Sequence, residues 1–174
     1  MVSIRWPTPE DHNAEANAQL MAMAKTAFLS THGHLFSQEE QALIRESTSI
    51  ANYRFSWTLL PKLLIALAAN GPQIVGAISL HRHNTPGEYG VIEPMNVHPD
   101  YQRQGVGTDL WTFIASQSKR FGDRGLQVWA LDRNEVAMNF YQNKIRLRVI
   151  GKGEWWLRDH MEPATGFQLD FYPN

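Results

Sequence analysis

The stretch from Met95 to Gly107 constrains this chain most, because it joins a strand-like pattern to a helical one through a glycine loop. Gly105 and Gly107 remove side chains where the first backbone N–H groups of a helix have no internal partner. The helix dipole adds partial positive charge at that end, and phosphate is the usual anion there. Arg103 can add a fixed charge. The stretch predicts a phosphate-binding turn, although two glycines at an ordinary helix start would read the same way.

Two better-known phosphate motifs do not fit this loop. No G-x-x-x-x-G-K-[ST] sequence occurs anywhere, so a nucleotide P-loop is not indicated. The dinucleotide fingerprint needs three glycines, and this loop has two.

The pattern on either side of the loop alternates between helical and strand-like periods. Strands are predicted over Val2–Trp6, Lys62–Ala69, Gln73–Arg82, Tyr89–Val97, Leu126–Leu131, Arg146–Trp156 and Gly166–Tyr172. Four helices are predicted. The first begins at a Thr8 N-cap, and the second runs from a Ser37–Glu40 capping box to before Pro61. The third follows Gly107, and the fourth covers Glu135–Gln142 with Asn134 as its N-cap. Ser30–Phe36 reads as a loop, and the last two strands as an antiparallel pair. This is a mixed α/β (α+β) plan, in which helices flank a mostly antiparallel sheet of about six to seven strands.

Composition fits one folded domain over residues 1–174. Apolar residues make up 43% and charged residues 19%, which favours a packed core over disorder. The net charge of −1 argues against nucleic acid or a membrane surface as a partner recognised by bulk charge. The longest wholly apolar run, Leu63–Ala69, is too short to cross a bilayer, and no apolar run near the start resembles a signal peptide. A cytoplasmic protein is therefore expected. Because the chain has no cysteine, thiolate metal sites and a cysteine nucleophile are excluded.

Two motifs carry a resemblance to a known family. Gln102–Gly107 matches [QR]-x-x-G-x-[GA] at every fixed position, and Asn134-x-x-Ala137-x-x-Phe140-Tyr141 follows a predicted buried strand. With the order of elements, these motifs resemble the GNAT superfamily of acyl-CoA-dependent N-acyltransferases. The resemblance spans nearly the whole chain, but specific motifs lie only within residues 89 to 145.

The resemblance implies a coenzyme A site and roles for particular residues. The glycine loop would hold the pyrophosphate, Asn134 would contact the pantetheine or phosphate region, and Tyr141 would protonate the departing thiolate. A backbone N–H of Met95, Asn96 or Val97, with Val97 favoured, would stabilise the thioester oxygen. The expected coenzyme-binding residues are Met95, Asn96, Val97, Gln102, Arg103, Gln104, Gly105, Val106, Gly107, Thr108, Asn134, Phe140 and Tyr141. From the residues alone, Asn134 could be only a helix cap and Tyr141 only a packing residue.

The general base is less certain than the coenzyme site. By period two, Glu93 shares a face with Val91 and Met95, and several members of the family place a catalytic glutamate on this strand. A structural ion pair is the alternative for Glu93, and His81 and His83 are rival bases. Pro94 marks a bulge or an edge, and fits the place where strands of this family splay apart. A glycine commonly follows the motif helix, whereas here Asn143 must supply the left-handed turn.

The acceptor is the least defined part of the expectation. The family would line its acceptor cleft with Ser30–Phe36 and Gly151–Thr165, which contain His32, His34, Phe36, Glu154, Trp155, Trp156, Asp159 and Glu162. Aromatic rings beside acids suit a cation, although the tryptophans could equally be core or subunit interface. His32 and His34 lack partners at metal-ligand spacing, so no metal is expected.

The resulting hypothesis is an enzyme, an N-acetyltransferase. It would move an acetyl group from the cosubstrate acetyl-CoA to a primary amine of a small molecule or peptide, by direct attack in a ternary complex. The alternatives are a non-catalytic acyl-CoA sensor domain and a protein N-terminal or lysine acetyltransferase. The resemblance leaves a homodimer open.

Overall fold

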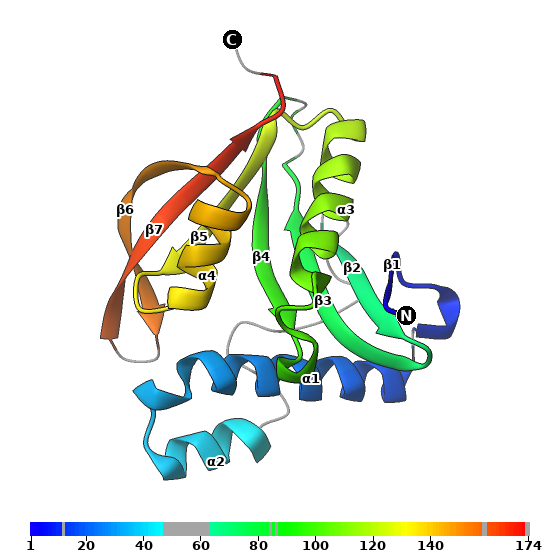
Figure 1. Ribbon diagram of the computed structural model, residues 1–174, viewed down its shortest axis with the longest axis vertical. Coiled ribbons are helices and arrows are strands. Elements are labelled where there is room, and N and C mark those ends of the chain that lie inside the picture. The colour runs from blue at the N-terminus through cyan, green and yellow to red at the C-terminus, as the bar shows by residue number, and fades with distance from the viewer. Residues whose placement is uncertain (12, 47–62, 84, 86, 158–159, 173–174) are drawn as a thin grey trace. The chain divides into compact units, whose positions relative to one another are not determined.

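The computed structural model describes residues 1–11, 13–46, 63–83, 85, 87–157 and 160–172 (Figure 1). The described chain forms two compact units. Unit 1 comprises residues 1–80 and 94–114, and unit 2 comprises residues 81–93 and 115–174. The predicted single domain stays a prediction, and each unit is described by itself.

Seven strands form one mixed sheet in the order β1-β2-β3-β4-β5-β7-β6. The described registers are antiparallel for β1–β2, β5–β7 and β6–β7, and parallel for β4–β5. The strands are β1 (Ser3–Arg5), β2 (Leu63–Asn70), β3 (Gln73–His81), β4 (Tyr89–Val97), β5 (Gly125–Leu131), β6 (Arg148–Leu157) and β7 (His160–Asp170). The predicted fold class is confirmed.

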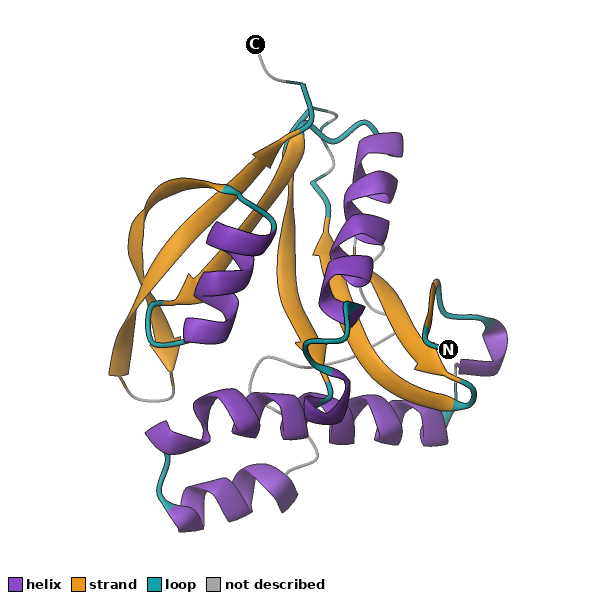
Figure 2. Cartoon of the chain, in the orientation of Figure 1, coloured by secondary structure: helices purple, strands orange, loops and turns teal. Residues whose placement is uncertain are grey.

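The described α-helices follow β1, β4 and β5 along the chain (Figure 2). They are α1 (Ala14–His32), α2 (Gln38–Glu46), α3 (Val106–Arg120) and α4 (Glu135–Asn139). Short 3-10 turns cover Pro9–Asp11 (η1), Gly33–Leu35 (η2) and Pro99–Tyr101 (η3), and a π-helical turn, η4, covers Phe140–Lys144. Within the described ranges, no helix is both long and apolar enough to cross a membrane.

The core of unit 1 is built by α1 against β2 and β3. Apolar residues of α1 recur at three- and four-residue steps, so they share one face of the helix. That face packs with small and branched side chains of the two strands: the cluster is Ala16, Leu20, Met23, Ala27, Leu67, Ile74 and Ala77.

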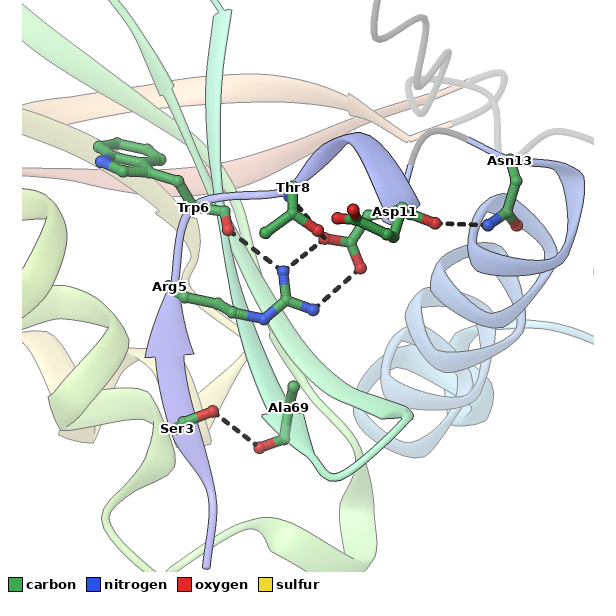
Figure 3. Close-up of polar contacts among 8 residues, drawn as sticks. Ser3, Arg5, Trp6, Thr8, Asp11, Asn13 and Ala69 are labelled. Carbon is green, nitrogen blue, oxygen red and sulfur yellow. Dashed lines mark hydrogen bonds and ion pairs between the residues drawn. The ribbon is translucent and has the colours of Figure 1, made fainter.

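The start of α1 differs from the prediction, because Thr8 is not its N-cap (Figure 3). The Thr8 N–H and hydroxyl donate to the Asp11 carboxylate at 2.7 and 3.1 Å. This holds Thr8 at the η1 turn, and Arg5 completes the cluster as a two-nitrogen partner of Asp11. The cap of α1 is Asn13, whose Oδ1 accepts from the Ala16 N–H at 2.8 Å.

The segment Ser30–Phe36 is also more ordered than the predicted loop. α1 continues to His32, and the hydroxyls of Ser30 and Thr31 donate back to the Ala27 carbonyl at 2.8 and 3.1 Å within it. The predicted capping box is confirmed, because the Ser37 N–H donates to Glu40 at 2.8 Å and the Glu40 N–H to Ser37 Oγ at 3.2 Å. The predicted end of this helix, before Pro61, lies outside the described residues.

Unit 2 is built on the antiparallel trio β5, β7 and β6 (Figure 1). The two final strands pair as far as Leu157 with His160. β6 begins two residues later and ends one residue later than predicted, whereas β7 is longer than predicted. The predicted start of the last strand at Gly166 was wrong, because the residues from Met161 to Thr165 already pair along β6. Asn143 is not left-handed, as it lies inside the π turn, and Arg146 has the positive φ of 62° instead.

Candidate functional site

The glycine loop leaves β4 at a point where two strands of unit 1 approach closely. A Cβ added at Gly76 in β3 would come within 3.1 Å of the Asn96 carbonyl oxygen, so glycine keeps the two backbones close. The His98 N–H donates to the Val75 carbonyl at 2.8 Å. These contacts fix the backbone at the end of β4, where Met95, Asn96 and Val97 were expected to serve the thioester.

Two glutamines of the motif hold the loop together internally. Gln102 Nε2 donates to the Val97 carbonyl at 3.0 Å, and Gln104 Nε2 donates to the Asp100 carbonyl at 2.6 Å. The backbone of η3 closes the turn, since the Gln102 N–H donates to the Pro99 carbonyl at 3.1 Å. The two glutamine side chains thus hold the loop in shape by hydrogen bonds to the carbonyls of Val97 and Asp100.

Tyr101 ties the loop to the turn between β2 and β3. Its hydroxyl accepts from Asn70 Nδ2 at 3.1 Å and donates to Gln73 Oε1 at 3.3 Å. His98 braces the start of the loop itself, because its Nδ1 accepts the Asp100 N–H at 3.3 Å. The sequence analysis did not predict the bracing role of Tyr101. The only signal for it was a tyrosine hydroxyl directly before the Gln102–Gly107 motif.

The backbone at the loop's end has the geometry of an anion cradle. Arg103 and Gly105 have positive φ angles of 61° and 93°, whereas Gln104 between them does not. Alternation of this kind turns successive N–H groups toward one side and makes an anion-binding nest. A positive φ is unusual for arginine, and its sequence gives no signal of it.

The helix that follows adds its first amides to this cradle. The Asp109 N–H donates to the Gly105 carbonyl at 3.0 Å, which makes Gly105 the N-cap of α3. The amides of Val106, Gly107 and Thr108 therefore precede the first intrahelical bond. Val106 is buried and orients the helix end, while Arg103 and Gly105 are exposed. The seven predicted residues from Gln102 to Thr108 lie in one turn at the positive end of a fifteen-residue helix, and all of them except Val106 are exposed or half-buried.

The second motif lies in unit 2 and has its own geometry. Asn134 Oδ1 accepts from the Ala137 N–H at 3.0 Å, so the predicted cap is confirmed. The helix widens into the π turn η4 directly after α4, and Phe140 and Tyr141 are its first residues. Wide turns of this kind are frequent at functional sites. Tyr141 is 5% exposed and its ring lies 5.6 Å from that of Phe167.

The candidate bases lie on exposed or half-buried positions of unit 2. Glu93 and His83 are exposed, and His81 is half-buried. The paired register of β4 with β5 runs from Tyr89 to Ile92, and Pro94 follows two residues later. That order fits a strand that leaves its neighbour near the proline, and the splay itself stays a prediction.

The segments expected to line an acceptor cleft are partly structural. His32 of unit 1 stacks on Phe28 at 4.8 Å, and burial lowers the pKa of its imidazole, which keeps it neutral near pH 7. Glu162 of unit 2 is buried and pairs with Arg133 at 3.4 Å. Asp159 lies outside the described residues. Among the described histidines and acids, no group of three or more could hold a metal ion.

Comparison with known proteins gives a match to one family. Residues 19–145 match the profile described as the acetyltransferase (GNAT) family. No curated protein matches.

Solved structures similar to this chain share its fold at low sequence identity. The PaiA N-acetyltransferase from Thermoplasma acidophilum, in complex with coenzyme A, is 17% identical with a TM-score of 0.68, over 98% of this chain and 99% of that chain. The ribosomal-protein-S18-alanine N-acetyltransferase from Escherichia coli is 16% identical with a TM-score of 0.69, over 100% of this chain and 96% of that chain. NAA60 from Arabidopsis thaliana, in complex with a bisubstrate analogue, is 12% identical with a TM-score of 0.65, over 98% of both chains.

Proposed function

The chain belongs to the acetyltransferase (GNAT) family, and from that premise we propose that it transfers an acetyl group from acetyl-CoA to a primary amine. The observation that carries the proposal is the turn from Gln102 to Thr108. It combines a φ alternation at Arg103 and Gly105 with the first amides of a long helix. Coenzyme A carries a pyrophosphate, which is the anion that such a turn suits.

The resemblance to the family assigns coenzyme contacts to residues of both motifs. The amides of residues 103 to 108 hold the pyrophosphate, and Arg103 adds a positive charge that is exposed at the rim. Asn134 and Phe140 contact the pantetheine arm. The solved structures with coenzyme A or a bisubstrate analogue support an acyl-CoA cosubstrate for the fold, but at their low identity they do not identify the acceptor.

The chemistry is a direct attack in a ternary complex. The neutral amine nitrogen bonds to the thioester carbonyl carbon, and the backbone N–H of Val97 stabilises the charge on its oxygen. The carbon–sulfur bond then breaks, and the thiolate takes a proton from Tyr141. Glu93 accepts the proton that the amine loses, with His81 and His83 as the rival bases. No cysteine is present to carry the acyl group, which agrees with a route without an acyl-enzyme.

The acceptor is a small molecule or a peptide. A protein N-terminus or lysine and a non-catalytic acyl-CoA sensor are the remaining alternatives, and a homodimer is compatible with each. We further propose a single domain in the cytoplasm, with neither nucleic acid nor membrane as a partner.

An amine panel tests this proposal. The purified protein is incubated with acetyl-CoA and individual amines or peptides, and release of free thiol is followed. Amine-dependent thiol release is the expected result. Binding of acetyl-CoA without turnover on any acceptor would favour the sensor, and turnover on peptides alone would favour protein acetylation.

A further inference from the structure

A network of three polar side chains fastens the connection between β5 and α4 to the neighbouring strands. Asp132 directly follows β5. Its Oδ2 accepts from Lys152 Nζ of β6 at 2.8 Å, and its Oδ1 accepts from the Thr165 hydroxyl of β7 at 2.5 Å. Lys152 Nζ also donates to Thr165 Oγ1 at 2.7 Å, so each of the three side chains contacts the other two.

The connection is held on both faces of β7. The Asp132 N–H donates to the Pro163 carbonyl at 2.8 Å, and Arg133 Nε lies 3.4 Å from Oε2 of Glu162, which is buried. Because successive residues of a strand point to opposite faces, Glu162 and Thr165 lie on opposite faces of β7. Two consecutive residues, Asp132 and Arg133, are thus bound to opposite sides of the same strand.

The Asp132 network combines one exposed charge with one buried hydroxyl. The Lys152 ammonium and then the Thr165 hydroxyl hold the pKa of the Asp132 carboxyl below its ordinary value, so the carboxylate is ionised at neutral pH. The Lys152 side chain is largely exposed, and an exposed ion pair adds little to global stability. Thr165 is 1% exposed, and its buried hydroxyl fixes the direction of the carboxylate.

The helix that follows depends on the segments at its two ends. α4 has five residues, each exposed or half-buried, and so short a helix is marginal by itself. At its start, Asn134 caps the helix two residues after Asp132. At its end, Tyr141 is buried in the π turn, with its ring 5.6 Å from that of Phe167 in β7.

Both attachments reach one face of β7. Thr165 and Phe167 are two residues apart in that strand, so their side chains point to the same face. Thr165 holds Asp132, and Phe167 contacts the Tyr141 ring. The segment from Asp132 to Tyr141 is therefore anchored at neighbouring positions of one strand, and a displacement at the first anchor changes the path by which the chain reaches the second.

We propose that Asp132 is a positioning residue for the acetyl transfer, and that the Asp132 network fixes where Tyr141 presents its hydroxyl. This inference rests on the proposed function, in which Tyr141 protonates the departing thiolate. Asp132 itself touches neither substrate nor coenzyme in this proposal. It acts through the path of α4 and η4, because proton transfer requires a hydroxyl held within hydrogen-bond reach of the sulfur.

An amide at position 132 tests the network with little change of shape. Asp132→Asn removes the charge, and its Nδ2 cannot accept from Lys152 or Thr165. We expect kcat to fall by roughly three- to tenfold. The rise in Tm that acetyl-CoA induces should be kept, because the turn from Gln102 to Thr108 contains none of these residues.

Asp170→Asn is the matched control, since Asp170 sits in a similar cluster at the other end of β7. It pairs with Arg148 at 3.0 Å and accepts from the Tyr89 hydroxyl. The Asp170 side chain is 29% exposed and that of Asp132 is 32% exposed. Asp170 pairs in register with Gly125 at the start of β5, whereas Asp132 follows the end of β5. Asp170→Asn should therefore keep the wild-type kcat.

Two substitutions at Lys152 keep the test independent of the Asp132 variant, in case that variant fails to fold. Lys152→Met removes the ammonium and should lower kcat by a few fold. Lys152→Arg restores a charged donor to Asp132 and should return kcat to within about twofold of wild type. A role of Lys152 limited to surface charge would leave kcat unchanged in both variants.

A double-mutant cycle shows whether Asp132 acts through Tyr141. In a Tyr141→Phe background, Asp132→Asn should lower kcat by less than about twofold, because the hydroxyl that the network positions is already absent. An equal loss in both backgrounds would show that Asp132 acts independently of Tyr141, and would overturn the inference.

Failure of the network and failure of the enzyme give different results. Wild-type kcat in both Asp132→Asn and Lys152→Met would overturn the inference and leave the acetyl transfer intact. The same loss in Asp170→Asn as in Asp132→Asn would also overturn it, since any carboxylate of unit 2 would then have the effect. A wild type that binds acetyl-CoA but turns over no amine would refute the proposed function, and this inference with it.

Discussion

The proposed role of Tyr141 depends on a single atom, its hydroxyl oxygen. It lies in the π turn after α4 and is 5% exposed, with its ring against Phe167. Its phenol O–H is the group that would donate a proton to the leaving thiolate. We predict that Tyr141→Phe lowers kcat by about tenfold or more, the usual range for general acid catalysis. The acetyl-CoA-induced rise in melting temperature should be unchanged, because the ring is kept; full activity in steady-state assays would remove Tyr141 as the acid.

The hydrogen-bonded Asp11 carboxylate should make the stability of the fold depend on pH. Two hydrogen bonds from Arg5 and those from Thr8 hold the pKa of the Asp11 carboxyl well below its usual range (Figure 3). A depressed pKa stabilises the fold above the unfolded-state pKa, near 3.9, and this contribution is lost as the pH falls toward the folded-state value.

Asp11→Asn should therefore lower the free energy of unfolding at pH 7 by about 1–3 kcal/mol. The difference in unfolding free energy between wild type and variant should narrow as the pH falls below about 4. The stabilisation that the ionised Asp11 carboxylate gives the folded wild-type protein is then lost. Urea unfolding at pH 7 and pH 3 measures both values. The exposed Glu39→Gln is the control, and an equal loss at both pH values would show that geometry, rather than charge, sets the effect.

At the scale of elements, Asn134 has a confirmed structural role and a proposed binding role. Its Oδ1 accepts from the Ala137 N–H at 3.0 Å, a bond that serine can replace. Asn134→Ala should cost about 1 kcal/mol of stability through loss of the cap. Asn134→Ser should keep most of that stability yet weaken acetyl-CoA binding, if the amide also contacts the coenzyme. Equal acetyl-CoA affinity in Asn134→Ser and wild type, by calorimetry, would leave Asn134 as a cap alone.

Local signals predicted much of the fold. The alternating pattern predicted the bounds of β4, and the capping box of Ser37 and Glu40 predicted the start of α2. Residues close together in the sequence determine both a strand's pattern and a helix cap. Thr8 was misassigned because its N–H and hydroxyl donate to Asp11, whose carboxylate is also held by Arg5 of β1.

One packing contact that the sequence did not predict depends on the register of three strands. In the sequence, Trp129 is one residue of a predicted buried strand, and Gly153 and Gly166 belong to the two final predicted strands. Only the register of β5, β7 and β6 brings the ring over both glycines. The glycine loop could be predicted because its residues are contiguous, whereas the φ sign at Arg103 could not, since arginine has no preference for it.

At the scale of the whole molecule, three described elements contribute residues to both compact units. β3, β4 and α3 each have residues in unit 1 and in unit 2. Loss of either unit would remove part of a strand and a helix from the other, so we predict a single cooperative unfolding transition. Scanning calorimetry should give a calorimetric enthalpy equal to the van't Hoff enthalpy. Two resolved transitions would contradict the proposal of a single domain.

Coenzyme binding by the Gln102–Thr108 turn is the central claim, and a thermal-shift titration tests it most directly. The wild-type protein and Gly107→Trp are each titrated with acetyl-CoA, coenzyme A and ATP. A ligand at a hundredfold excess over its Kd stabilises the fold by about 2.7 kcal/mol. The account predicts a clear rise in Tm with acetyl-CoA and coenzyme A, little with ATP, and no rise for Gly107→Trp, whose indole fills the turn. Equal stabilisation of both proteins by acetyl-CoA would contradict the placement of the coenzyme, and no rise with any of the three ligands would contradict the claim that this turn binds it.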